Sequence, residues 1–193
     1  MRTVIGIDPG LASTGWGVVK FDGSRFFHVG HGVVTTDSES PLPERLLKIH
    51  SEISRIIASH RPSEAGVEDL FFSKNATSAM HVAQARGVVL LALGQRSIPV
   101  GTYSPQQVKQ AVIGRGKAAK DQVQRLVGVV LGLEKAPGPD HAADALAVAI
   151  CHANRSYWRT GVLAYSLERL PARAARTRTR ARRHSGIPDS DVQ

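Results

Sequence analysis

The sequence predicts an α/β fold with a five-stranded mixed sheet flanked by helices. The first 35 residues read as three apolar strands joined by glycine-containing turns, and the rest of the chain alternates helical periodicity with two short apolar strands. Hairpin neighbours pair antiparallel, whereas strands connected through a helix pair in parallel, so the sheet is expected to be mixed. A chain of 193 residues has room for one such domain with a proper core.

The three N-terminal strands are expected at residues 3–8, 15–21 and 25–35. The first is the apolar run that ends in Asp8, and Pro9 and Gly10 follow it in a turn. Asp22 and Gly23 are typical of the turn between the second and third strands. These short connections predict two antiparallel pairings.

The middle of the chain predicts a helix, a strand and a second helix. Apolar residues recur with helical spacing over residues 43–60, and Arg61 and Pro62 end this helix. A short strand ends at Glu68, and the second helix is expected over residues 75–95. Its small residues form a stripe that permits close approach to the sheet or to a twin helix across a dimer axis: Ala76, Ala79, Ala83 and Gly87.

The last part of the chain predicts one strand, at residues 98–102, and three helices. Ser104 and Pro105 are typical of the N-cap and first turn of a short helix. A longer helix is expected over residues 117–133, and residues 137–139 break the chain before a helix that begins near Asp140.

Three acidic positions lie in matching apolar surroundings. Asp8 and Glu68 each end a short apolar strand, and Asp144 lies in the last helix one turn from both Asp140 and His141. Asp8 alone could equally serve its turn by a hydrogen bond. Together, however, clustered carboxylates repel one another unless cations bind, and magnesium is the natural choice for such ligands. Two such ions about 4 Å apart are a common device for phosphodiester hydrolysis.

The charge distribution indicates a polyanionic partner. The chain carries a net charge of +9, and the segment from residue 169 onward has seven arginines against two aspartates. A basic cluster within the body surrounds Gly114 and contains Lys109, Arg115, Lys117, Lys120 and Arg125. Basic groups near an acidic metal site are typical of proteins that bind nucleic acid phosphates.

Other features limit the cellular setting. No apolar run is long enough to span a bilayer, and the N-terminus lacks the layout of a signal peptide. The single cysteine, Cys151, cannot form an internal disulfide, and we interpret it as a small buried hydrophobic residue. A reducing, cytoplasmic setting without membrane contact is therefore expected.

Several segments resemble, in the same order, the motifs of the RuvC family of bacterial Holliday-junction resolvases, which have an RNase H-like fold. They are residues 6–10 and 14–17, Glu68 with Phe71, and residues 74–76, 84–87, 108–110 and 141–146. The resemblance covers roughly residues 2–155. It implies a nuclease domain at residues 1–160, followed by a basic tail at residues 161–193 that we expect to be disordered alone.

The resemblance also implies a function. A homodimer would nick two symmetrical strands of a four-way DNA junction, with two Mg²⁺ ions per subunit, in homologous recombination and DNA repair. The family implies the branch-migration proteins RuvA and RuvB as partners. Its metal-binding carboxylates fall on Asp8, Glu68 and Asp144, and the fourth position falls on His141, where many members carry aspartate. A neutral imidazole ligand suggests that Mn²⁺ can substitute; Asp140, otherwise a candidate helix N-cap, remains the alternative ligand.

The DNA-binding residues of the family also map onto this chain. Phe71 corresponds to the aromatic that stacks on an unpaired base in the opened junction, although Phe72 could take that role or Phe71 could belong to the core. Lys109 and Lys120 correspond to DNA-binding lysines, and Lys74 and Asn75 lie at a helix entry near the substrate. Arg115 and Lys117, in the basic cluster, complete the predicted DNA contacts.

Rival functions explain less of the sequence. A nucleotide-binding domain of the actin, sugar-kinase or Hsp70 type also begins with an apolar strand and Asp-x-Gly, but it needs two lobes, for which this chain is too short. A non-enzymatic DNA-binding protein would explain the arginine tail but not the three acids in apolar surroundings. An RNase H-like nuclease that acts on RNA is the nearest alternative, because metal chemistry alone does not fix the substrate.

Overall fold

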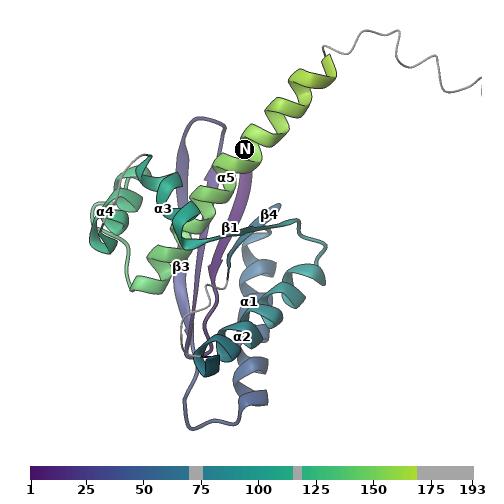
Figure 1. The fold of residues 1–193 in the computed structure, drawn as a ribbon, viewed down its shortest axis with the longest axis vertical. Coiled ribbons are helices and arrows are strands. Elements are labelled where there is room, and N and C mark those ends of the chain that lie inside the picture. The colour runs from purple at the N-terminus through teal and green to yellow at the C-terminus, as the bar shows by residue number, and fades with distance from the viewer. Residues whose placement is uncertain (70–75, 115–118, 169–193) are drawn as a thin grey trace, which may run out of the picture. The chain divides into compact units, whose positions relative to one another are not determined.

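The computed structural model describes residues 1–69, 76–114 and 119–168 (Figure 1). Its five strands are β1 (Arg2–Asp8), β2 (Ser13–Phe21), β3 (Phe26–Thr35), β4 (Glu64–Glu68) and β5 (Val100–Tyr103). They form one sheet in the order β3-β2-β1-β4-β5. β1 is antiparallel to β2 and parallel to β4, and β4 is parallel to β5. The predicted five-stranded mixed sheet is therefore confirmed.

Five helices accompany the sheet in the described residues. They are α1 (Leu42–His60), α2 (Ala76–Gly94), α3 (Pro105–Ile113), α4 (Lys120–Val130) and α5 (Asp140–Glu168). α4 is shorter than predicted, because Ala119 is its N-cap and Gly132, with a φ of 64°, turns the chain just beyond its end. None of the described helices is long and apolar enough to cross a membrane.

The chain divides into two compact units, Met1–Tyr157 and Trp158–Gln193. The first contains the whole sheet and α1 to α4. α5 ends at Glu168, so the described helix runs past residue 160, where the nuclease domain was predicted to end. Residues 169–193 of the predicted tail lie outside the described residues.

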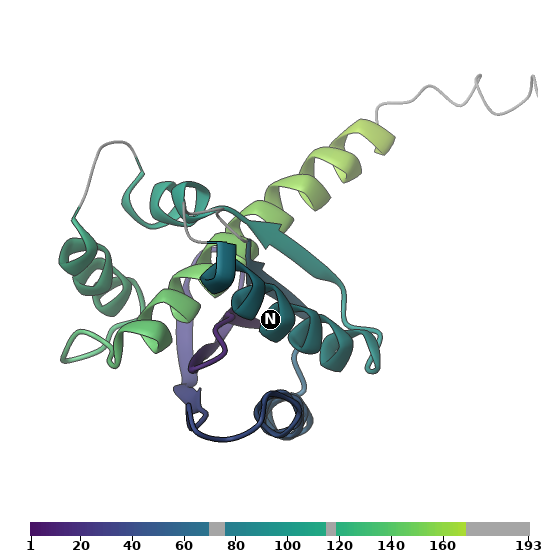
Figure 2. The ribbon, with the colours of Figure 1, turned by 60° about the horizontal axis from the view of Figure 1, so that its bottom comes forward.

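Helices cover both faces of the sheet (Figures 1 and 2). Side chains of a strand alternate between its faces, so Ile5, Ile7 and Val67 pack with α1 and α2 on one face. Val4 and Val19 face the other way and pack with α3, α4 and the buried part of α5. Asp8 and Glu68 have the same parity as Val4 and Gly66, so both carboxylates belong to the α5 face of the sheet.

Glycines allow α5 to lie very close to this face. A Cβ atom at Gly6 would lie 2.1 Å from the carbonyl oxygen of Ala145, and one at Gly15 would lie 1.9 Å from that of His141. Side chains at these two positions would therefore push the start of α5 away from β1 and β2. The apolar run of α5 completes the contact, because residues 145–150 are all buried.

Candidate metal centre

The two strand-end carboxylates come together at the carboxyl ends of β1 and β4. Ile7 is paired with Val67, so Asp8 and Glu68 are the next residues on two adjacent parallel strands. The two side chains lie close enough for the charge of Asp8 to raise the pKa of Glu68. Asp8 is largely buried, with a side chain that is 17% exposed. Parallel pairing across a helix thus turns two acids that are distant in sequence into neighbours.

The start of α5 brings an imidazole to the same point. His141 Nδ1 lies 2.7 Å from Asp8 Oδ2. Because Gly15 leaves room for the backbone of His141, the first turn of α5 reaches the end of β1. Asp144 follows one helical turn later. It lies close enough to Glu68 for its charge to raise the pKa of Glu68, and close enough to Asp8 for the charge of Asp8 to raise the pKa of Asp144.

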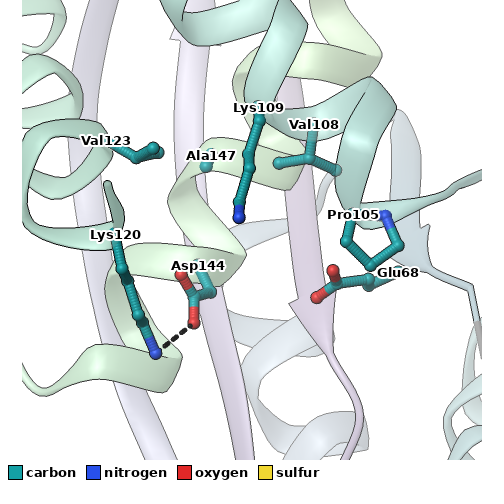
Figure 3. Close-up of a pocket in the computed structure, with 8 residues that line it drawn as sticks. All are labelled: Glu68, Pro105, Val108, Lys109, Lys120, Val123, Asp144 and Ala147. Carbon is teal, nitrogen blue, oxygen red and sulfur yellow. Dashed lines mark ion pairs between the residues drawn. The ribbon is translucent and has the colours of Figure 1, made fainter. Parts of the chain in front are cut away.

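Lys120 closes the cluster on the side of α4. Its Nζ atom lies 3.2 Å from Asp144 Oδ2 and 3.3 Å from Asp140 Oδ2. A hollow of about 210 Å³ opens here; Asp144 lies beside Lys120, Glu68 lies across from them, and Lys109 extends between them (Figure 3). Lysines from α3 and α4 therefore face carboxylates from β4 and α5 across one small space.

The protonation of the cluster reflects its crowding. Burial, followed by the charge of Asp8, raises the pKa of Glu68 to about 8. Burial also raises the pKa of Asp144, although Lys120 opposes this shift. Near neutral pH, Glu68 therefore retains a proton, which relieves the repulsion among the three acids.

The donor set fits a hard divalent cation. In their present arrangement, no three acidic, histidine or cysteine side chains among the described residues surround one common point as metal ligands would. The proton on Glu68 and the ammonium of Lys120 instead compensate the charges of the acids. A cation that displaced this proton and this ammonium could bind three carboxylates and one imidazole, which are at most half exposed.

Asp140 and His141 have different surroundings. Asp140 is 67% exposed, accepts a hydrogen bond of 2.9 Å from Gln124 Nε2 and pairs with Lys120. Backbone bonds to the carbonyl oxygen of Pro139 begin the helix, so the side chain of Asp140 contacts α4 rather than capping α5. His141, by contrast, contacts Asp8 directly, and this geometry favours it as the fourth candidate ligand.

The predicted DNA-binding residues are only partly described. Lys109 and Lys120 line the hollow, as expected for groups that meet phosphates near the cluster. Arg125, which belongs to the basic cluster but not to the predicted DNA contacts, forms an ion pair with Asp121 of its own helix. Phe71, Lys74, Asn75, Arg115 and Lys117 lie outside the described residues, so their roles stay predictions.

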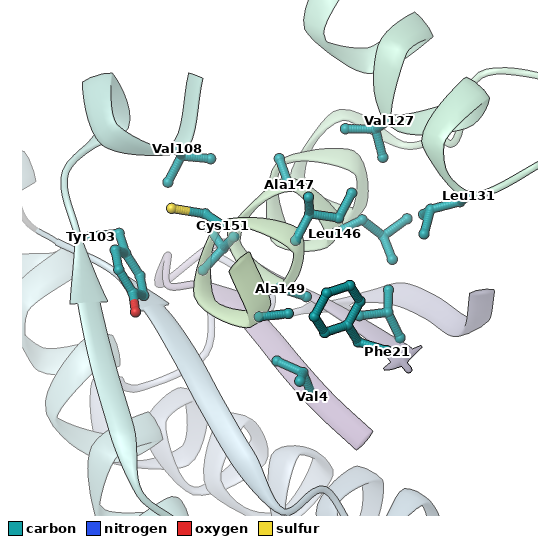
Figure 4. Close-up of a cluster of buried hydrophobic side chains, with 14 of the residues drawn as sticks. Val4, Phe21, Tyr103, Val108, Val127, Leu131, Leu146, Ala147, Ala149 and Cys151 are labelled. Atoms are coloured by element: carbon teal, nitrogen blue, oxygen red, sulfur yellow. The ribbon is translucent and has the colours of Figure 1, made fainter. Parts of the chain in front are cut away.

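Cys151 belongs to the hydrophobic cluster on the α5 face (Figure 4). It is fully buried, and burial raises the pKa of its thiol to about 11. A thiol that stays protonated is a poor nucleophile, which agrees with its interpretation as a core residue.

The glycines that admit α5 are the functional feature that sequence reasoning missed. Gly6, Gly15 and Gly17 all face α5, and each would clash with it if it carried a Cβ atom. Alternate glycines in β2 and a glycine at the paired position of β1 were a usable signal. They indicate that another backbone approaches the sheet at the level of the strand-end acids.

Comparisons with known proteins agree with this geometry. The family model described as "Crossover junction endodeoxyribonuclease RuvC" matches residues 4–152. The RuvC of Treponema denticola is 54% identical over 151 residues, which cover 78% of this chain and 85% of that protein.

Solved structures give the same result. RuvC of T. thermophilus, in complex with a Holliday junction substrate, has a TM-score of 0.79 at 40% identity and covers 83% of this chain and 98% of that one. The yeast mitochondrial Holliday junction resolvase Ydc2, at 13% identity over 86% of this chain and 82% of its own, supports the fold alone with a TM-score of 0.58. The chain has the predicted RNase H-like fold and belongs to the RuvC family of crossover junction endodeoxyribonucleases.

Proposed function

We propose that this protein is an endodeoxyribonuclease that resolves four-way DNA junctions by paired symmetrical nicks, in homologous recombination and DNA repair. The observation that carries the proposal is the convergence of Asp8, Glu68, His141 and Asp144 beside two lysines, in a chain of this family. The T. thermophilus relative was solved with a Holliday junction substrate, and 40% identity over most of both chains supports the same substrate here.

Family membership implies use of a divalent metal, and we assign it to Asp8, Glu68, His141 and Asp144. We further propose Mg²⁺, two ions per subunit, with Mn²⁺ as a substitute. When bound, such ions lower the pKa of the attacking water and stabilise the leaving oxygen. The acids contribute negative charge. Asp8 also holds the His141 ring through its bond to Nδ1, so Nε2 is the ring nitrogen that would remain for the metal.

The lysines are assigned to the DNA backbone. Lys120 is 53% exposed and pairs with Asp144, so it can exchange this carboxylate for a phosphate that enters the hollow. Lys109 is exposed and extends into the same space from α3 (Figure 3). Contacts of this kind hold and orient a strand without reading its bases.

A homodimer is part of the proposal, because paired nicks on a roughly two-fold symmetrical junction require two symmetrical sites. α2 supplies a candidate interface. Met80 is 61% exposed and Leu91 is 55% exposed, and a Cβ at Gly87 between them would meet nothing within 4 Å. Positions 80, 87 and 91 share one face of the helix, so a second α2 could pack there closely.

The remaining partners follow from the same family. We include RuvA and RuvB as partners, and a cytoplasmic setting, in the proposal. Family membership is compatible with these partners, and the absence of a described membrane-spanning helix is compatible with this setting.

A plasmid that extrudes a cruciform tests the proposed function. Two coordinated nicks convert the supercoiled circle directly to a linear product, whereas single nicks give an open circle. We expect linear product with Mg²⁺, and open circles from Leu91→Glu, which places a charge on the exposed face of α2. A wild-type protein that cuts RNA junctions in preference to DNA junctions, or leaves the cruciform intact, would contradict the proposal.

A further inference from the structure

A second hollow, of about 290 Å³, adjoins the metal-binding candidates at His141. The turn at residues 10–13, Arg45 of α1, His81 and Val82 of α2, and His141 line it. The first hollow shares Glu68 and Asp144 with the cluster, whereas this one shares His141. The two hollows therefore adjoin different members of the candidate ligand set, so a strand bound at the ligands can contact both hollows.

Arg45 lines the second hollow and is anchored by a hydrogen bond. Its Nε atom donates a hydrogen bond of 2.9 Å to Thr36 Oγ1, and Thr36 Oγ1 donates one of 2.6 Å to the carbonyl oxygen of Leu11. The two terminal nitrogens of Arg45 have no hydrogen bond or ion pair with any residue that the structure describes. The side chain is thus fixed through one nitrogen, while its remaining donors are available to a ligand.

The charge of the second hollow favours an anion. Arg45 is the one formally charged residue among the described residues that line it, and none of these described residues is acidic. The first hollow, in contrast, contains two carboxylates as well as two lysines. Leu11 and Val82 add an apolar surface beside the guanidinium of Arg45. A guanidinium next to an apolar wall suits a phosphate with its attached sugar.

We propose that the second hollow binds the nucleotide adjacent to the scissile phosphate on the cleaved strand, with Arg45 as the ligand of its phosphate and His81 as a second contact. The inference rests on the proposed nuclease function and adds a subsite to it. A volume near 290 Å³ lies at the lower end of the roughly 300–1,000 Å³ of typical ligand pockets, which fits one nucleotide and not a duplex.

The test compares Arg45→Gln with Arg55→Gln. Arg55 lies on the same helix but is 68% exposed and paired with Glu52, so its substitution removes the same charge at a distance from the hollow. Junction binding is measured in chelator, and single-turnover cleavage in Mg²⁺. We expect Arg45→Gln to weaken binding about 5- to 30-fold and to reduce the slope of log affinity against log salt by about 1, as for one lost phosphate contact. Arg55→Gln should behave as wild type.

A methylphosphonate scan then locates the contact. One neutral linkage is placed at each position flanking the cut, and wild type should lose affinity at one adjacent position where Arg45→Gln loses none. Equal losses for both proteins at every position would overturn the subsite, even if Arg45→Gln binds weakly. Should Arg45→Gln fail to fold, the exposed His81→Asn serves in the same scan, with the same two outcomes. Wild-type protein that cleaves no junction would instead contradict the proposed function itself.

Discussion

Glu68→Gln should stabilise the metal-free protein, and only at high pH. The pKa of Glu68 is raised from its ordinary value near 4.5 to about 8, first by burial and then by the charge of Asp8. The folded state therefore retains a proton that the unfolded chain releases between these two values. Stability is lost as pH rises through this window, and the full interval corresponds to about 5 kcal/mol as an upper limit. Glutamine has nearly the same shape and no charge to bury.

Urea unfolding in chelator, from pH 4.5 to pH 8.5, measures this difference. The free energies of unfolding of wild type and Glu68→Gln should nearly coincide at the acid end and diverge as pH rises, with the variant several kcal/mol more stable at pH 8.5. Glu52→Gln, on the exposed surface of α1, is the matched control and should follow wild type. Mg²⁺ should narrow the gap, because the cation replaces the missing proton. A gap between wild type and Glu68→Gln that does not change with pH would refute the reasoning.

Three further predictions concern the site and its support. Asp8→Asn should abolish junction cleavage but leave binding within a few-fold of wild type, as gel shift and cleavage on one substrate can check; near wild-type cleavage would remove Asp8 from the site. His141→Ala should lose cleavage and Asp140→Ala should retain most of it under identical Mg²⁺ and pH, and the reverse pattern would make Asp140 the ligand. His152 is 6% exposed and lies 2.9 Å from Tyr103 Oη and 3.0 Å from Glu64 Oε2. His152→Leu should lower the free energy of unfolding in urea by about 2–3 kcal/mol, and a loss below about 0.5 kcal/mol would discount this buried network.

Much of the fold could be predicted because local signals and tertiary packing agree. The isoleucines of α1 that recur at helical spacing are buried, including Ile49, Ile53 and Ile56, whereas Leu47 is 65% exposed. Ser104 is the N-cap that its sequence position predicts, and it forms a capping box with Gln107. The end of α4 was misplaced because Leu131 and Leu133 continue the apolar pattern, while Gly132 already adopts a left-handed conformation. Periodicity alone does not register a backbone turn of this kind.

The site was predictable in its members but not in its geometry. The strand ends placed Asp8 and Glu68 together, because parallel pairing of their strands follows from the helix between them. The choice between Asp140 and His141 depends on tertiary contacts: Gly15 accepts the backbone of His141, and Gln124 of α4 binds Asp140. The second hollow joins a turn and three helices, and no local signal in the sequence connects Arg45 and His81 with Gly10 and His141.

Cleavage of a four-way DNA junction, beside a duplex and a single strand of matched sequence, tests the central claim most directly. We expect wild-type protein in Mg²⁺ to cut two opposite strands of the junction at symmetrical positions and to leave both controls intact. The same reaction in chelator should give no cut while the junction stays bound. Equal cutting of junction and duplex, or cutting that persists in chelator, would contradict the account.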